Sequence, residues 1–279
     1  MRVNCTIYFT LLSLCISTAR AQAPDPFTPK QHQLVEQVST IFENSSSEFQ
    51  YGYIEDIDDG AGITAGRVGF NNSSLFEFVQ KYTQLQPNNI LVKYLSCLQF
   101  IAEHGPAYEC LFPSVPKEFL KTKIFKRTKL REYDFGKDFV TAAEDPIMRQ
   151  TQDHMVEHNI YQPTIEWFHR LHLKTAVGFL IIYDSILQQG IDATQGLMVM
   201  LRLSPPWNGN EYKWLKAYLR VRKSVQKHPF YPDGKRRYKV APYTCYQRSD
   251  SLMEILKSKN MNLQPPLLFK YFDEQFELK

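Results

Sequence analysis

A long apolar segment near the middle of the chain most constrains the fold. Residues 164–190 read TIEWFHRLHLKTAVGFLIIYDSILQQG, and most of them are apolar. A helix that is apolar on all sides has to be buried, so the segment predicts one central helix. Asp184 lies inside this run, where burying an unpaired carboxylate would be costly.

The flanking sequence predicts more helices. Thr28, Pro29 and Gln31 form a helix start, because Thr28 can cap, Pro29 suits the first turn and Gln31 completes a capping box. Apolar residues at helical spacing continue this helix to about Glu43. Similar spacing predicts helices over residues 73–82 (capped by Ser73 or Ser74), 88–105, 145–161, 211–226 and 249–258.

Between the first two helices, the sequence predicts a hairpin. Residues 49–57 are rich in strand formers, DDGAG at 58–62 is a turn, and ITAGRVGF at 63–70 returns. The expected fold is therefore mainly α (α+β), with one small β-hairpin or sheet. The chain has 279 residues, 43% of them hydrophobic, which is enough for one two-lobed domain. We expect the lobes to divide near residues 75–90.

The first residues predict a secretory signal peptide over residues 1–21. Arg2 precedes the apolar run CTIYFTLLSLCIS, and Ala19-Arg20-Ala21 fits a small-x-small cleavage site, with cleavage after Ala23 as an alternative. The run is too short to span a membrane, and no other segment is long enough. Residues 22–279 are therefore expected to be a secreted, extracellular domain without a membrane partner.

Three cysteines remain in residues 22–279, namely Cys97, Cys110 and Cys245. An odd number allows at most one internal disulfide and one free thiol. Both Cys97–Cys110 and Cys110–Cys245 stay open as pairings. The hydrophobic core is expected to carry most of the stability.

The charge balance argues against nucleic acid as a partner. The formal net charge is +4, and it falls by two when Arg2 and Arg20 leave with the signal. The basic runs KTKIFKRTKLR and GKRRYK are more typical of solvated surfaces than of a polyanion site. The sequence has no P-loop, G-x-G-x-x-G or G-x-S-x-G motif, which argues against nucleotide binding and α/β-hydrolase chemistry. We expect a monomer.

Acidic residues concentrate between Glu43 and Asp59. A carboxyl beside Phe42 at the end of an apolar helix is partly desolvated, which favours its protonated form, whereas a carboxylate on a glycine-lined turn stays ionised. Two carboxyls in such different environments suit glycosidic bond cleavage, and a helix followed by a hairpin is the order of a lysozyme-like cleft. The pattern alone is more typical of a helix-terminal acid and a solvated turn.

Several motifs in order resemble one known family. ENSS followed by YIEDIDDGAGITAG resembles the active-site signature of the family 46 glycoside hydrolases, the chitosanases. The resemblance covers most of residues 30–278 and continues in FVQKYTQLQPNNILVKYL, YDSI, LRVRK, QRSDS and NLQPPL; residues 104–118 and 226–246 match poorly and look like insertions. It implies a lysozyme-like fold and a secreted endo-chitosanase that hydrolyses β-1,4 bonds between glucosamine units, with chitosan or partly acetylated chitosan as substrate and no metal or organic cofactor.

The resemblance also implies residue roles. Glu43 matches the family's general acid, Asp59 its general base, and Thr64 the threonine that helps to hold the attacking water. Such inverting chemistry places the two carboxyls roughly 6.5–9.5 Å apart, which leaves room for water.

A supporting charge network is implied as well. Arg248, in QRSDS, matches an arginine near the catalytic acid, where a guanidinium can orient the carboxyl. Arg222, in RVRK, matches a second arginine of this network, and Asp184 is expected to partner both.

Substrate-binding residues are expected along the hairpin. Glu55, Asp56 and Asp58 can attract a cationic sugar chain through charge-assisted contacts, although Asp56 has the alternative role of bracing the hairpin. Tyr53 can pack against a sugar ring, or it can be a core residue.

The sequence departs from the family pattern at four positions. Ser74 stands where an aspartate often recognises the substrate amine, Ala61 where an arginine is common and Ile63 where a tyrosine is common. Asp58 adds an acid beside Asp59 and can alter or take over its role. The departures predict a shift of substrate preference towards more acetylated chains.

Two alternatives belong to other classes. HMVEH, with His154, Glu157 and His158, matches the H-x-x-E-H signature of inverted zinc proteases, but a third ligand is not evident, and His169 and His172 are more typical of packing or surface positions. The other alternative is a catalytically weak carbohydrate-binding or defence protein on the same scaffold. The retained Glu43, Asp59 and Thr64 argue against it.

Overall fold

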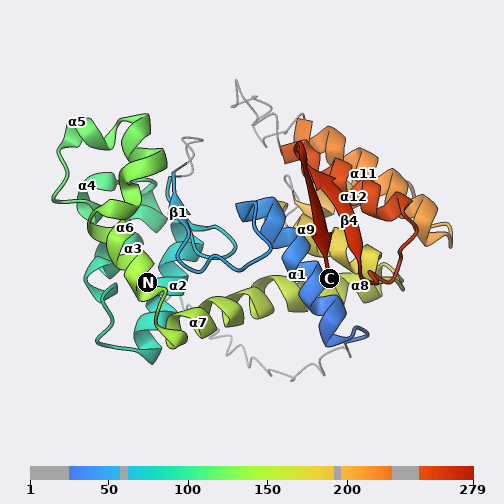
Figure 1. Cartoon of the computed structure of the whole chain (residues 1–279), viewed down its shortest axis with the longest axis horizontal. Coiled ribbons are helices and arrows are strands. Elements are labelled where there is room, and N and C mark those ends of the chain that lie inside the picture. Colours follow the sequence, from blue (N-terminus) through green and yellow to red (C-terminus); the bar gives the residue numbers. More distant parts are fainter. Residues whose placement is uncertain (1–24, 57–61, 192–195, 228–244) are drawn as a thin grey trace, which may run out of the picture.

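The computed structural model describes residues 25–56, 62–191, 196–227 and 245–279, which form two lobes joined by a long helical segment (Figure 1). The joining segment is α7 (Pro146–Val156), continued by the π-helical turn η4 (Glu157–Tyr161).

One lobe holds the middle of the chain. Its elements are β1 (Ile54–Glu55), β2 (Thr64–Ala65), β3 (Phe70–Asn71), α2 (Asn72–Leu85), η1 (Val92–Tyr94), α3 (Leu95–His104), α4 (Tyr108–Leu111), α5 (Lys117–Leu120), η2 (Phe125–Lys129), η3 (Leu130–Glu132) and α6 (Asp134–Ala142). The other lobe holds α1 (Pro29–Asn44), α8 (Gln162–Arg170), α9 (Ala176–Gln189), α10 (Leu197–Leu203), α11 (Glu211–Lys227), α12 (Cys245–Lys257), β4 (Leu267–Tyr271) and β5 (Glu274–Leu278).

The predicted start of α1 is confirmed. The Thr28 side chain accepts a hydrogen bond from the Gln31 backbone N–H, and the Gln31 side chain accepts one from the Thr28 backbone N–H. Pro29 occupies the first turn. The helix ends at Asn44 because Ser45 adopts a left-handed conformation, with φ of 53°. Its buried face packs into the core of the second lobe through Leu34, Val35, Val38, Ile41 and Phe42.

The single central helix expected over residues 164–190 is wrong, because the segment forms two helices. α8 ends at Arg170, and α9 begins at Ala176, where the Thr175 side chain accepts from the Gly178 backbone. The carboxylate of Glu211 accepts hydrogen bonds from the backbone N–H groups of Lys174 and Thr175 and so stabilises the break. α9 alone is the central helix, with residues 176–186 all buried.

The expected hairpin is part of a three-stranded antiparallel sheet with the order β1-β2-β3. Glu55 pairs with Thr64, and Thr64 pairs with Asn71. Residues 57–61, which include the predicted turn acids, lie outside the described residues. α2 is capped by Asn71 and not by Ser73 or Ser74, and the Ser74 hydroxyl instead closes the capping box by accepting from the Asn71 backbone N–H (3.0 Å).

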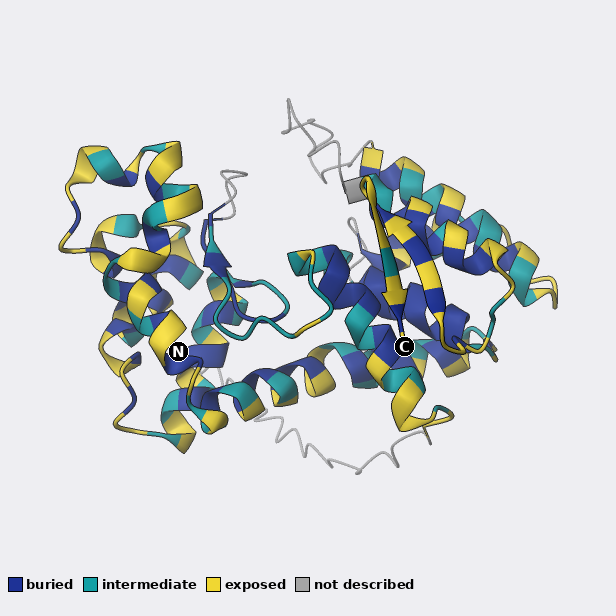
Figure 2. Cartoon of the chain, viewed as in Figure 1, coloured by how far each residue is buried: buried dark blue, intermediate teal, exposed yellow. Residues whose placement is uncertain are grey.

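Each lobe has its own hydrophobic core (Figure 2). One core surrounds α9 and takes in α1, and the other contains every buried apolar residue of α2. The chain therefore passes between the cores after α1 and again between Met155 and Val156. This corrects the expected division near residues 75–90, which falls at α2 and the loop after it, inside one core.

Two further features complete the fold. A disulfide joins Cys97 on α3 to Cys110 on α4, with the two Cα atoms 5.8 Å apart. Of the two pairings that the sequence leaves open, the structure has this one. Among the helices of the described ranges, none combines the length and apolar character needed to cross a membrane.

Candidate active site

Glu43 lies in the last turn of α1, where the helix leaves the core. The preceding residue, Phe42, is buried, and its carbonyl accepts a hydrogen bond from the Tyr271 hydroxyl (3.0 Å). The Glu43 side chain is 22% exposed, and its Oε1 atom lies 2.7 Å from Nη2 of Arg248 on α12. The carboxyl group is therefore fixed by the core on one side and open to solvent on the other.

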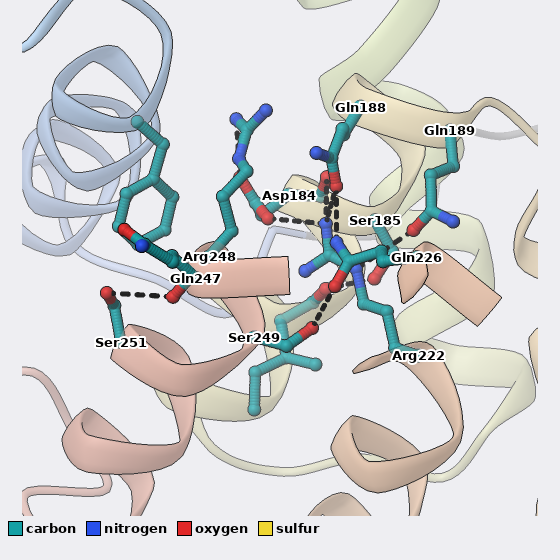
Figure 3. Close-up of polar contacts among 12 residues, drawn as sticks. Asp184, Ser185, Gln188, Gln189, Arg222, Gln226, Gln247, Arg248, Ser249 and Ser251 are labelled. Atoms are coloured by element: carbon teal, nitrogen blue, oxygen red, sulfur yellow. Dashed lines mark hydrogen bonds and ion pairs between the residues drawn. The ribbon is translucent and has the colours of Figure 1, made fainter. Parts of the chain in front are cut away.

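Arg248 links Glu43 to Asp184, which lies deeper in the lobe. Arg248 Nη2 is also 2.9 Å from Asp184 Oδ1, and Asp184 Oδ2 is 2.7 Å from Nη2 of Arg222 on α11. Figure 3 shows Asp184 between the two arginines. The side chains of Asp184 and Arg222 are fully buried, and that of Arg248 is 5% exposed. When Glu43 is ionised, two carboxylates and two guanidinium groups balance in charge, which favours burial of the ions.

Side-chain amides also contact the inner arginine. Arg222 donates to Oε1 of Gln188 (2.7 Å) and Oε1 of Gln189 (3.0 Å), one turn after Asp184 on α9. Gln226 donates to the same Gln188 oxygen (2.7 Å), and Ser249 donates to Gln226 (2.7 Å). These contacts join α9, α11 and α12 (Figure 3).

The charge of Arg248 is stabilised by this arrangement. Burial opposes the charged form, but the carboxylates of Asp184 and Glu43 outweigh it and raise the pKa of Arg248. The guanidinium also lies 5.4 Å from the centre of the Phe42 ring. A charged donor thus faces Glu43 Oε1.

The hairpin approaches the other oxygen of Glu43 at Gly69. A Cβ atom at Gly69 would lie 3.9 Å from Glu43 Oε2 and 2.9 Å from Cγ2 of Thr64. Gly69 has a φ of +72°, a conformation that glycine adopts without strain. Thr64 and Glu43 therefore both border the space that a side chain at Gly69 would occupy.

Tyr53 and Glu55 extend the site along the hairpin. Burial raises the pKa of Tyr53, and the hydrogen bond to Glu55 and the charges of Glu55 and Glu43 raise it further. A pocket of about 450 Å³ opens beside Tyr53 and also borders Tyr51 and Arg131. Tyr53 therefore lies at the edge of an open pocket, within the electrostatic field of Glu43.

Asp56 braces the hairpin, which is one of the two roles that the sequence allows for it. It is 1% exposed, its carboxylate accepts a hydrogen bond from the Tyr108 hydroxyl, and its Oδ2 atom is 3.4 Å from Nζ of Lys126. Direct contact with a sugar would require this buried carboxylate to leave both partners. Asp58 and Asp59 lie outside the described residues, so the spacing of Glu43 and Asp59 stays a prediction.

The HMVEH motif lies on the surface of the joining segment. His154, Glu157 and His158 are exposed, and the two imidazole rings are parallel with centres 6.1 Å apart. Within the described ranges, no group of three or more His, Cys, Asp or Glu side chains is arranged to hold a metal ion.

Sequence reasoning missed some of the residues that build the site. Gln188 and Gln189 follow Asp184 by about one helical turn, and this spacing was the signal that could have assigned them to the network. Arg67, in the turn between β2 and β3, contacts α1 and α7. Its partners are distant in the sequence, so no local pattern marked it.

The sequence is similar to those of known proteins. Residues 37–134 and 125–267 match the model of Glycosyl hydrolase family 46. A chitosanase from Bacillus subtilis is 30% identical over 272 residues, covering 94% of this chain and 88% of that protein. A chitosanase from Nocardioides is 29% identical, covering 90% and 82%.

Solved structures show the same likeness. A chitosanase from Gynuella sunshinyii in complex with chitotetraose has a TM-score of 0.73 and 31% identity, over 91% of this chain and 99% of that one. A native chitosanase from Bacillus subtilis has a TM-score of 0.73 and 29% identity, over 91% and 100%. These likenesses confirm the mainly α, lysozyme-like, two-lobed fold.

Proposed function

The chain belongs to glycosyl hydrolase family 46, and we propose that it is an endo-chitosanase that hydrolyses β-1,4 bonds between glucosamine units with inversion. Relatives named chitosanases, and a solved relative in complex with chitotetraose, support a chitosan-type polysaccharide as the substrate.

Glu43 is the general acid in this proposal. Its Oε1 atom accepts from Arg248, so the proton of the acid form resides on Oε2, the oxygen nearer Gly69. From there it passes to the glycosidic oxygen as the bond breaks. The contact of Arg248 with Oε1, which leaves Oε2 on the side of the hairpin, is the observation that carries the proposal.

The hairpin supplies the other half of the reaction. Asp59, placed by its match to the family motif, acts as general base and removes a proton from water as the water attacks the sugar carbon. Thr64 holds that water. The attack comes from the face opposite the leaving oxygen, so the configuration at the sugar carbon inverts.

The network behind Glu43 stabilises the carboxylate that forms when Glu43 gives up its proton. Once Glu43 has lost its proton, Arg248 pairs with a full carboxylate, which strengthens their contact. Asp184 and Arg222 hold Arg248 in place while this charge changes. Glu55 and Tyr53 are the proposed contacts for the cationic sugar chain, with Asp58 beside the base.

Glu43→Gln tests the proposal. The amide keeps the size of the side chain but cannot deliver a proton, so hydrolysis of chitosan should fall by about 10³-fold or more while oligomer binding, measured by calorimetry, persists. Glu48→Gln, at an exposed acid shortly after α1, is the matched control and should hydrolyse normally.

The outcomes separate the proposal from its alternative. Normal hydrolysis by Glu43→Gln would contradict the role of Glu43. A wild-type protein that binds oligomers without cleaving them would indicate the carbohydrate-binding alternative.

Secretion and a monomeric state are also proposed. The signal-like sequence of residues 1–21 supports secretion, and amino-terminal sequencing of the exported protein should find a start at residue 22 or residue 24. Light scattering of the purified protein should give the mass of one chain.

A further inference from the structure

A buried arginine joins the catalytic hairpin to the other lobe. Arg67 lies in the turn between β2 and β3, and its side chain is 4% exposed. Its Nη2 atom is 3.0 Å from Oε1 of Glu36 on α1, and its Nη1 atom forms an ion pair with Asp153 on α7. The guanidinium lies over the ring of Phe49, 4.0 Å from its centre.

The backbone of the same turn is held as well. The Arg67 N–H donates to Oε1 of Gln152 (2.9 Å), and the Arg67 carbonyl accepts from Nδ2 of Asn44 (3.3 Å). Gln152 also donates to the Tyr51 carbonyl (3.0 Å), and the Tyr51 hydroxyl donates to Asp153 (2.9 Å). Side-chain and backbone contacts thus tie the turn to both α1 and α7.

These contacts fix where the hairpin lies along α1. Arg67 touches Glu36 and Asn44, which are separated by about 12 Å along the helix. Glu43 is the neighbour of Asn44, and Gly69 brings the hairpin to Glu43 Oε2. The buried apolar residues of the hairpin and of α1 belong to different cores. Polar contacts therefore contribute much of what fixes the position of the hairpin along α1.

We propose that Arg67 is a positioning residue that registers the hairpin bearing Thr64 against the helix bearing Glu43. The inference rests on the proposed function of Glu43. A misplacement of about 1 Å between reacting groups can cost about 10²-fold in rate. A residue that only stabilised the fold would not change the rate of the protein that remains folded.

Arg67→Met provides the first test. On a glucosamine hexamer, kcat should fall about 100-fold while KM changes by only about threefold, because the hairpin shifts relative to Glu43 but carries its proposed sugar contacts, Tyr53 and Glu55, with it. Arg67→Lys keeps a charge that can reach one carboxylate and should recover part of kcat. The control is Arg170→Met, an exposed arginine on α8 that lies 4.2 Å from the centre of the Trp167 ring, and it should keep the wild-type kcat.

Glu36→Gln provides a milder variant, because it keeps the Arg67–Asp153 ion pair and the size of the side chain. Its kcat should be below that of the wild type, as for Arg67→Lys. In the double variant that combines Arg67→Lys with Glu36→Gln, kcat should fall by a smaller factor than the product of the two single-variant factors. The reason is that the two residues act through one contact. Thermal unfolding of each variant ensures that rates refer to folded protein.

Hydrogen exchange without substrate gives a readout that does not depend on hydrolysis. Peptides covering residues 62–71 should exchange faster in Arg67→Lys and Glu36→Gln, and the core of α9 should be unchanged. Wild-type kcat together with wild-type exchange in both folded variants would overturn the role of Arg67. An inactive wild type would overturn the proposed function, and exchange would still decide whether Arg67 holds the hairpin.

Discussion

At the scale of single residues, Asp184 connects the core of its lobe to Glu43, the proposed catalytic acid. It is fully buried in α9, a strongly apolar helix, and contacts both Arg222 and Arg248. The sequence pointed to a constrained role because an unpaired carboxylate cannot lie in such a run. The structure shows the physical answer, which is a charge-balanced set that ends at Glu43.

Asp184→Asn should destabilise the protein strongly. It leaves two buried guanidinium groups with one fewer carboxylate, and breaking a buried ion pair on one side costs roughly 3–5 kcal/mol. Urea unfolding should show this loss. Asp250→Asn is the matched control, because Asp250 pairs with Lys223 at 48% side-chain exposure and should cost less than about 1 kcal/mol. Equal losses in the two variants would contradict the structural role of the network.

At the scale of elements, a helix boundary could be predicted from the sequence where the residues that determine it lie close together in the chain. The start of α1 was predictable because its cap lies within four residues, Thr28 to Gln31. The break between α8 and α9 was not, because the carboxylate that stabilises it belongs to Glu211, 36 residues beyond Thr175. The role of Arg67 was not predictable for the same reason, since its partners Glu36 and Asp153 are 31 and 86 residues away.

The hairpin also depends on a glycine. Gly69→Ala should lower kcat by about tenfold or more, because the added Cβ would lie 2.9 Å from Thr64 Cγ2 and would push Thr64 out of its position. Gly105→Ala is the matched control: Gly105 has a φ of +92° and open space around the Cβ position. Both variants should lose about 1–3 kcal/mol of stability through backbone strain, because both glycines have a positive φ. A normal kcat in folded Gly69→Ala would show that the position of Thr64 is unimportant.

At the scale of the whole molecule, two separate cores meet at the site. The proposed acid, Glu43, comes from the lobe built on α9, and the hairpin comes from the lobe that contains α2 (Figure 1). This division could not be read from the sequence, because it depends on the chain leaving one core after α1 and returning to it through α7. The family motifs nevertheless placed Glu43, Arg248, Asp184 and Arg222 together before any contact was known.

The buried tyrosines predict how stability depends on alkaline pH. Burial raises the pKa of Tyr218 to about 12, and burial with the Asp153 contact raises that of Tyr51 to about 12. Unfolded tyrosine titrates near 10, so between pH 10 and 12 the unfolded state holds fewer protons and the free energy of unfolding falls as pH rises. Urea unfolding at several pH values should show this fall. Tyr218→Phe should make it shallower, and an unchanged slope would contradict the burial effect.

Proton NMR of the purified protein acting on a glucosamine hexamer tests inverting hydrolysis most directly. We predict that new reducing ends form first as the α-anomer, because water attacks the face opposite the departing sugar. Early formation of the β-anomer would contradict the roles of Glu43 and Asp59. No cleavage of the hexamer, of partly acetylated chitosan or of chitin oligomers would contradict hydrolysis itself.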